Sequence, residues 1–213
     1  MKRILTASIF TVAILTGAYA QRVGNEQKIT WGIKVETNFS GFIISETSYL
    51  TGFMKQGALT GGFVFVEFNE HFALQGEVMW YYKRSDLVRH DISGKYSSFG
   101  VGVPVYAVCQ QKFGAGSRIY GGLGLYTDFG FDATLKRNGE TIKPFEKDGE
   151  TEVSAMKDVD TGFGIIAGYE FANGIQLNAG YKICATNILD ANSSVLKMLP
   201  QSFAFGAGYR FGK

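Results

Sequence analysis

Alternation of apolar and polar residues with a period of two recurs along most of this 213-residue chain. In the first such segment, Ile29, Trp31 and Ile33 would share one face of a strand, while Lys34 and Glu36 would share the other. About eight segments of this kind follow one another, which predicts an all-β protein. The predicted strands are 29–40, 57–68, 72–84, 95–109, 117–131, 158–171, 174–186 and 201–211.

Three later segments, 72–84, 117–131 and 174–186, repeat the two-faced pattern clearly. Their predicted apolar face holds Leu74, Val78, Trp80, Tyr82, Ile119, Leu123, Leu125, Phe129, Phe131, Leu177, Ala179, Tyr181 and Ile183. Their predicted polar face holds Gln75, Glu77, Lys83, Arg118, Tyr120, Tyr126, Asp128, Asp132, Gln176, Asn178 and Lys182. The sequence leaves open which way Phe63 and Phe65 point.

The predicted strands are 11 to 15 residues long, whereas strands of soluble sheets average roughly 5–6 residues. Twelve residues at about 3.3 Å each, tilted by about 45°, span roughly 28 Å, which matches a hydrocarbon core. Long gaps at 41–56, 85–94, 132–157 and 187–200 alternate with short turns, as in transmembrane barrels. We therefore expect an eight-stranded antiparallel up-and-down transmembrane β-barrel over 29–211, with any surface ligand or secretion-machinery partner bound by the four long loops.

The N-terminus has the layout of a secretory signal. Lys2 and Arg3 precede an uncharged stretch of 18 residues, which contains the small-residue motif Ala18-Tyr19-Ala20. A membrane anchor is the alternative, but this stretch is at the short edge of the roughly 20 residues that a spanning helix needs. We expect cleavage after residue 20, a short periplasmic segment over 21–28, and a destination in the outer membrane.

Charge and cysteine content narrow the classes of partner. Removal of the signal would leave 19 basic and 19 acidic residues, so nothing indicates a nucleic-acid partner, and we expect outer-membrane lipid instead. Cys109 and Cys184 fall on non-adjacent predicted strands, so we expect free thiols rather than a disulfide. The chain has 28 glycines, but its 18 phenylalanines and 11 tyrosines indicate a packed structure rather than a disordered one.

A barrel in lipid must close, because each unpaired backbone group costs several kcal/mol there. Strand 29–40 should therefore pair with strand 201–211. Eight strands leave an interior that side chains fill, and charges enclosed there should pair, since an unpaired buried charge is costly. The predicted lumen set is Lys34, Glu36, Glu67, Glu77, Lys83, Arg118, Asp128, Glu170, Lys182 and Arg210. Inward glycines at Gly32, Gly100 or Gly102, Gly122 and Gly124 would make room for these side chains.

Aromatic residues gather near the ends of the predicted strands. They are Trp31, Trp80, Tyr82, Phe131, Tyr169, Phe171, Tyr209 and Phe211. Such residues are typical of the interfacial girdles of membrane proteins, although each could also belong to an ordinary core.

Several segments resemble the PorT-like outer-membrane β-barrel family of the Bacteroidetes type, often labelled porin family. The segments are Phe72-Ala-Leu-Gln-Gly-Glu77, Val103-Pro104-Val105, Gly121-Gly-Leu-Gly-Leu-Tyr126, the run from Gly162 to Phe171, Tyr181-Lys182 and Thr186-Asn187-Ile188. The resemblance implies an outer-membrane location and a barrel fold, and it implies no single activity.

The chemistry-bearing residues favour a non-enzymatic protein. The two histidines, His71 and His90, lie in a turn and a loop, and no His, Cys or Asp cluster has zinc spacing, so we expect no cofactor or metal. Four readings stay open at this point: a structural, surface-binding or secretion-support barrel, a narrow channel for ions or small solutes, an enzyme that uses His90, and a soluble lipocalin-like periplasmic barrel. The first of these is the prediction.

Overall fold

The computed structural model describes residues 28–45, 50–89, 92–114, 116–137, 139–146, 156–189 and 197–212. The predicted signal over 1–20 and His90 lie outside these residues. Within them the strands are β1 (Lys28–Ser45), β2 (Leu50–Glu67), β3 (Phe72–Arg89), β4 (Ile92–Phe113), β5 (Ser117–Arg137), β6 (Glu140–Ile142), β7 (Val159–Glu170), β8 (Ile175–Cys184) and β9 (Lys197–Phe211). No helix among the described residues is long and apolar enough to span a bilayer.

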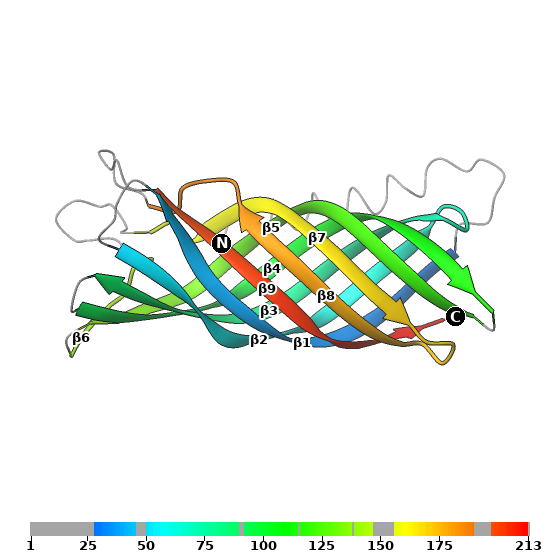
Figure 1. The fold of residues 1–213 in the computed structure, drawn as a ribbon, viewed down its shortest axis with the longest axis horizontal. Coiled ribbons are helices and arrows are strands. Elements are labelled where there is room, and N and C mark those ends of the chain that lie inside the picture. The colour runs from blue at the N-terminus through cyan, green and yellow to red at the C-terminus, as the bar shows by residue number, and fades with distance from the viewer. Residues whose placement is uncertain are drawn as a thin grey trace.

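Eight of the described strands form a closed antiparallel ring (Figure 1). Each strand pairs with the next in the ring, and β9 returns to β1 along a register that runs from Trp31 opposite Phe211 to Ser45 opposite Lys197. The three-residue β6 pairs only with the end of β5, outside the ring. The predicted fold and the predicted closure of the first strand on the last are therefore confirmed.

The two faces of each strand lie where the alternation places them. On β1, Trp31 and Ile33 are 57% and 53% exposed on the outer face, whereas Lys34 is buried inside. Phe63 and Phe65, whose direction the sequence leaves open, both point into the barrel and are buried. The exterior is thus apolar over the middle of the barrel, and the polar side chains are enclosed.

Much of what the sequence predicts as long loops is strand. The predicted loop 41–56 is the end of β1 and the start of β2, and the predicted loop 85–94 is likewise shared by β3 and β4. β5 continues to Arg137, and β9 begins at Lys197, so the predicted loops 132–157 and 187–200 are also shorter than expected. The reason is that β1 to β5, at 18 to 22 residues, exceed the roughly 9–11 residues that cross a bilayer. The far ends of these strands lie outside the bilayer, so apolar and polar residues need not alternate there.

A β-bulge corrects one predicted orientation. Phe99 of β4 pairs with Asp132 of β5, whereas the next residue, Gly100, pairs with Gly130, so Phe131 is the extra residue. One inserted residue exchanges the two faces of a strand. Asp132 is therefore exposed on the outer face rather than sharing the inner face with Arg118, and Ala133 is buried in its place.

The two rims of the barrel differ. The rim that carries the start of β1 and the end of β9 also carries the short turns 68–71 and 171–174, and we call it the terminal rim. The opposite, far rim is filled by an apolar cluster. Its buried members are Phe42, Leu87, Tyr96, Ala133, Met156, Cys184, Ile188 and Met198.

Candidate functional site: a closed lumen

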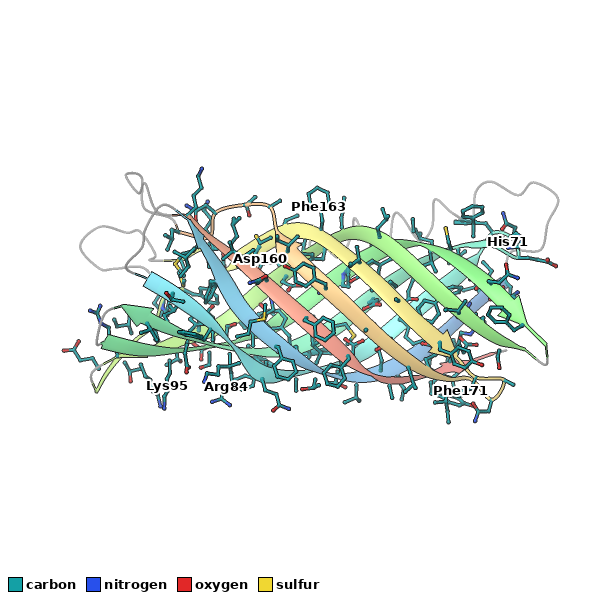
Figure 2. All side chains as sticks on the ribbon, viewed as in Figure 1. His71, Arg84, Lys95, Asp160, Phe163 and Phe171 are labelled. Carbon is teal, nitrogen blue, oxygen red and sulfur yellow. The ribbon has the colours of Figure 1, made fainter. Side chains whose placement is uncertain are left out.

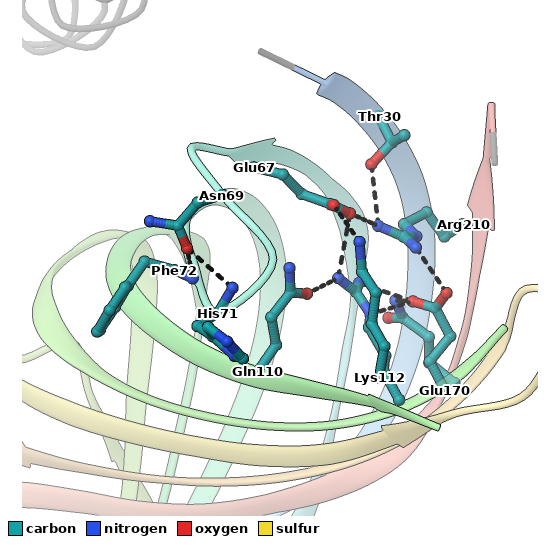
Figure 3. Close-up of polar contacts among 11 residues, drawn as sticks. Thr30, Glu67, Asn69, His71, Phe72, Gln110, Lys112, Glu170 and Arg210 are labelled. Carbon is teal, nitrogen blue, oxygen red and sulfur yellow. Dashed lines mark hydrogen bonds and ion pairs between the residues drawn. The ribbon is translucent and has the colours of Figure 1, made fainter. Parts of the chain in front are cut away.

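The charged cluster nearest the terminal rim is built on two arginines and two glutamates (Figure 3). Arg210 donates through one nitrogen to Glu67 and through another to Glu170, both at 2.8 Å. Arg118 lies 2.7 Å from Glu170 and 3.5 Å from Glu67. All four side chains are 7% exposed or less, so both charges of each sign are enclosed and paired.

Neutral groups complete this terminal cluster. Gln176 donates to Glu170 at 2.7 Å, Thr30 accepts from Arg210 at 3.4 Å, and Gln110 accepts from Arg118. Arg118 also lies 4.1 Å above the ring of Phe65, which itself is fully buried. Each buried charge thus has hydrogen-bond or ring partners as well as counter-charges, which is the condition under which a buried ion network is tolerated.

A second cluster lies on β1 and β3. The ammonium group of Lys34 lies 2.8 Å from Glu77 and 3.1 Å from Glu36. Gln75 donates to Glu77 at 2.6 Å. Because Lys34 and Glu77 alternate with the outward residues of their own strands, the register of β1, β2 and β3 brings these charges together across the lumen.

A third cluster lies nearer the far rim. Asp128 accepts hydrogen bonds from Lys83 at 2.6 Å and from Lys182 at 3.3 Å. Asp160 of β7 lies 3.8 Å from Lys83. The two lysines also lie over aromatic rings, Lys83 at 4.4 Å from the ring centre of Tyr81 and Lys182 at 4.8 Å from that of Tyr126.

The structure places all ten residues of the predicted lumen set inside the barrel, each within an ion pair. It adds two charged residues that the sequence reasoning missed. Asp160 lies in a segment with weak alternation. Lys112, which is half exposed at the terminal rim, reaches Glu67 at 2.9 Å from the end of β4, which the sequence predicts as a turn. Gly32 and Gly102 do make room, because a side chain there would overlap Phe63 and Asp128, respectively.

Little space is left between these clusters. One cavity of about 30 Å³ is lined by Lys34, Glu77, Lys83 and Asn178, and a second of about 30 Å³ lies beyond Lys83, towards Ser85 and Tyr96. Each holds about one water molecule. Lys83 lines both cavities. The apolar far-rim cluster closes the lumen above.

The exterior carries two aromatic bands. The band near the terminal rim includes Trp31, Tyr169 and Phe171, with the ring centres of Trp31 and Phe211 4.3 Å apart. The second band, which we call the far girdle, consists of Trp80, Tyr82, Phe99 and Phe131, all between 45% and 51% exposed. In Figure 2, Phe163 projects from the wall between the ends of the barrel. The predicted interfacial aromatics are therefore on the outer surface.

The described residues contain no group of three or more metal-ligating side chains. His71 lies exposed in the turn 68–71, where its backbone carbonyl accepts a hydrogen bond from the Gln110 N–H at 2.7 Å. Cys109 is exposed on the outer face, and Cys184 is buried, and both are free thiols, as predicted.

A closed ring of eight strands with an apolar outer band and an ionic lumen defines a transmembrane β-barrel. The comparison with family models agrees. The chain belongs to the outer membrane protein beta-barrel domain family, whose model matches residues 8–211, and its location is the outer membrane. That location overturns the soluble periplasmic reading.

Solved structures with this fold share little sequence with the chain. Neisserial surface protein A matches at 12% identity over 86% of this chain and 99% of that chain, with a TM-score of 0.47. The Yersinia pestis protein Ail, crystallised with the heparin analogue sucrose octasulfate, matches at 16% over 88% and 100%, with a TM-score of 0.44. OprG of Pseudomonas aeruginosa matches at 14% over 88% and 98%, with a TM-score of 0.50, which supports the fold and assigns no activity. A comparison with curated proteins found no match.

Proposed function

We propose that this protein is a closed, non-enzymatic outer-membrane barrel that acts through its outer surface, in surface binding or in support of a secretion machine. The observation that carries the proposal is the obstructed lumen. Three ion-pair clusters and the apolar far-rim cluster follow one another along the axis, and the two cavities between them each have room for about one water.

Orientation is part of the same proposal. Transmembrane barrels carry short turns on the periplasmic side and longer segments outside, so the terminal rim faces the periplasm and the far rim faces the exterior. The elongated ends of β1 to β5 then form a wall above the bilayer, which offers a surface for a partner. Protease shaving of intact cells tests this orientation: cleavage is expected between 143 and 157, and cleavage confined to permeabilised cells would contradict it.

Conductance in planar bilayers tests the closed lumen. The purified protein should give no stable current steps above the background of protein-free membranes, and regular steps that scale with protein concentration would contradict the proposal. The second candidate, a narrow channel, is favoured by one feature: the side chain of Lys83 lines both cavities. Movement of Lys83 away from Asp128 would join them.

We also propose that residues 1–20 are a cleaved signal and that the chain belongs to the PorT-like branch of its family. The first is supported by the charged start and the Ala18-Tyr19-Ala20 motif, and the second by the segments that resemble that branch. Mass spectrometry of the protein from outer membranes tests the signal, because the mature chain should begin at Gln21. A chain that retains Met1 would contradict it.

A further inference from the structure

A group of basic side chains lies on the outer face of the barrel just beyond the far girdle. In the strand register, Lys55 of β2 is opposite Arg84 of β3, Asp86 of β3 is opposite Lys95 of β4, and Lys95 is opposite Lys136 of β5. Directly paired residues share a face of a sheet. All four basic side chains are exposed, and Figure 2 shows Arg84 and Lys95 projecting from the same side of the wall.

This basic face is only partly neutralised. Lys55 forms an ion pair with Asp86 at 2.9 Å. Asp132 is also exposed nearby, opposite Phe99. Within the described part of the chain, no carboxylate forms an ion pair with Arg84, Lys95 or Lys136. Among the described residues, Arg84, Lys95 and Lys136 thus point away from the barrel on three neighbouring strands and outnumber the carboxylates beside them, Asp86 and Asp132.

The height of these cations relative to the bilayer follows from the strands. Arg84 lies four residues beyond Trp80 on the same strand and face, so it is about 9 Å further along the barrel axis at a 3.3 Å rise and 45° tilt. Since Trp80 and Tyr82 mark the bilayer interface, Arg84 reaches the level of lipid headgroups, and Lys95 and Lys136 lie above it. Lipid phosphates occupy that level.

An apolar groove runs down the same wall, within the bilayer. It has a volume of about 480 Å³ and lies between Trp31 and Trp80, with Ile33 and Val78 among its lining residues. It is hollow because Gly62 and Gly76 lack side chains on the outer face, and a Cβ added at Gly76 would meet nothing within 4 Å. At roughly 30 Å³ for each water-sized group, the groove has room for a long acyl chain.

We propose that this wall binds one phosphorylated lipopolysaccharide molecule of the outer leaflet. Arg84, Lys95 and Lys136 bind its phosphates, and an acyl chain occupies the groove beside Gly76. Arginine suits this role because its guanidinium group can hold a phosphate with two hydrogen bonds. The inference rests on the proposed orientation, and it is independent of whether the lumen conducts.

The test is a titration of fluorescent lipopolysaccharide into the purified protein in non-ionic detergent. The variant R84Q/K95Q/K136Q should bind about 100-fold more weakly, since each of the three basic residues near a lipid surface contributes about fivefold. The matched control K28Q/K157Q/K197Q removes three exposed cations elsewhere and should bind as the wild type does. Equal weakening of both variants would overturn the proposal, and so would no weakening of the first.

Two further arms identify the ligand. Dephosphorylated lipopolysaccharide and phosphatidylglycerol should bind more weakly than intact lipopolysaccharide, and equal binding of either would overturn the assignment, as would full competition by inorganic phosphate. For the groove, G76L should weaken binding, whereas G121L, at an outward glycine of β5 where an added Cβ meets only Ile166 at 3.7 Å, should not. Heat-modifiable gel mobility confirms that each variant has folded, and loss of binding in both glycine variants would contradict the groove assignment.

Discussion

Glu170 is the residue whose replacement should most disturb the barrel interior. Its carboxylate is fully buried and lies 2.7 Å from Arg118, 2.8 Å from Arg210 and 2.7 Å from Gln176. Glu170→Leu would leave the two buried arginines, Arg118 and Arg210, with Glu67 as their remaining buried counter-charge, and Glu67 already pairs with the half-exposed Lys112. Removing one partner of a buried ion pair lowers the free energy of unfolding by about 3–5 kcal/mol, because the remaining charge stays enclosed without its partner.

A paired replacement separates this electrostatic effect from lost packing. In R118L/E170L both partners are removed, while the buried Arg210 keeps its buried counter-charge Glu67 at 2.8 Å. Apolar substitution of a whole buried pair is often neutral or stabilising. The double variant should therefore be more stable than E170L alone, with a coupling energy of about 2 kcal/mol or more between the two sites.

Urea unfolding in lipid vesicles, followed by heat-modifiable gel mobility, measures these changes. With a slope near 3 kcal/mol per M, E170L should lower the unfolding midpoint by about 1 to 2 M. The control E140L, at an exposed position of β6, should leave the midpoint unchanged. Additive effects of R118L and E170L, or a midpoint for E170L equal to that of the control, would refute the reasoning.

Three other predictions concern the lumen and the wall. K83S/K182S removes both lysines that bind Asp128 and should produce small conductance steps in planar bilayers, whereas K28S/K143S, at two exposed positions, should not. The absence of steps from K83S/K182S would exclude Lys83 as the barrier. Gly102→Ala should lower the free energy of unfolding by about 1–3 kcal/mol in the same urea assay, because the added Cβ overlaps the Asp128 carboxylate. Gly76→Ala should be neutral or slightly stabilising, because an added Cβ there meets nothing within 4 Å. Equal losses of stability in the two variants would contradict the assigned faces. A membrane-soluble maleimide should modify Cys109 and spare the buried Cys184 in the folded protein, so that mass spectrometry shows one adduct, and two adducts before unfolding would contradict this.

The faces of the strands could be predicted from the sequence because the bilayer requires apolar residues on the outer face of every strand that crosses it. Lys34, Glu77 and Arg210 alternate with lipid-facing residues, so a two-residue period fixes their direction without knowledge of the partners. Closure then follows from the cost of unpaired backbone in lipid. Which charges meet does not follow, because the pairing of Arg118 with Glu170 depends on the register of β5 and β7.

The predictions fail mainly for segments outside the bilayer, where the outer face of a strand need not be apolar. The far ends of β1 to β5 stand beyond the lipid, so segments such as 41–56 lack clean alternation although they are paired strands. The bulge at Phe131 has no marked signal in the sequence, and it reverses the direction of Asp132. Met156 and Ile188 fill the far rim from segments that the sequence predicts as solvated loops.

The central claim is that the apolar sides of the strands contact lipid while the charges are enclosed, and the two tryptophans test it directly. Trp31 and Trp80 are 57% and 49% exposed, on the outer face. In vesicles, lipids brominated along their acyl chains should quench most of the tryptophan fluorescence, and aqueous acrylamide should quench little of it. Strong quenching by acrylamide with none by brominated lipid would show that this face does not meet the bilayer, and it would contradict the account.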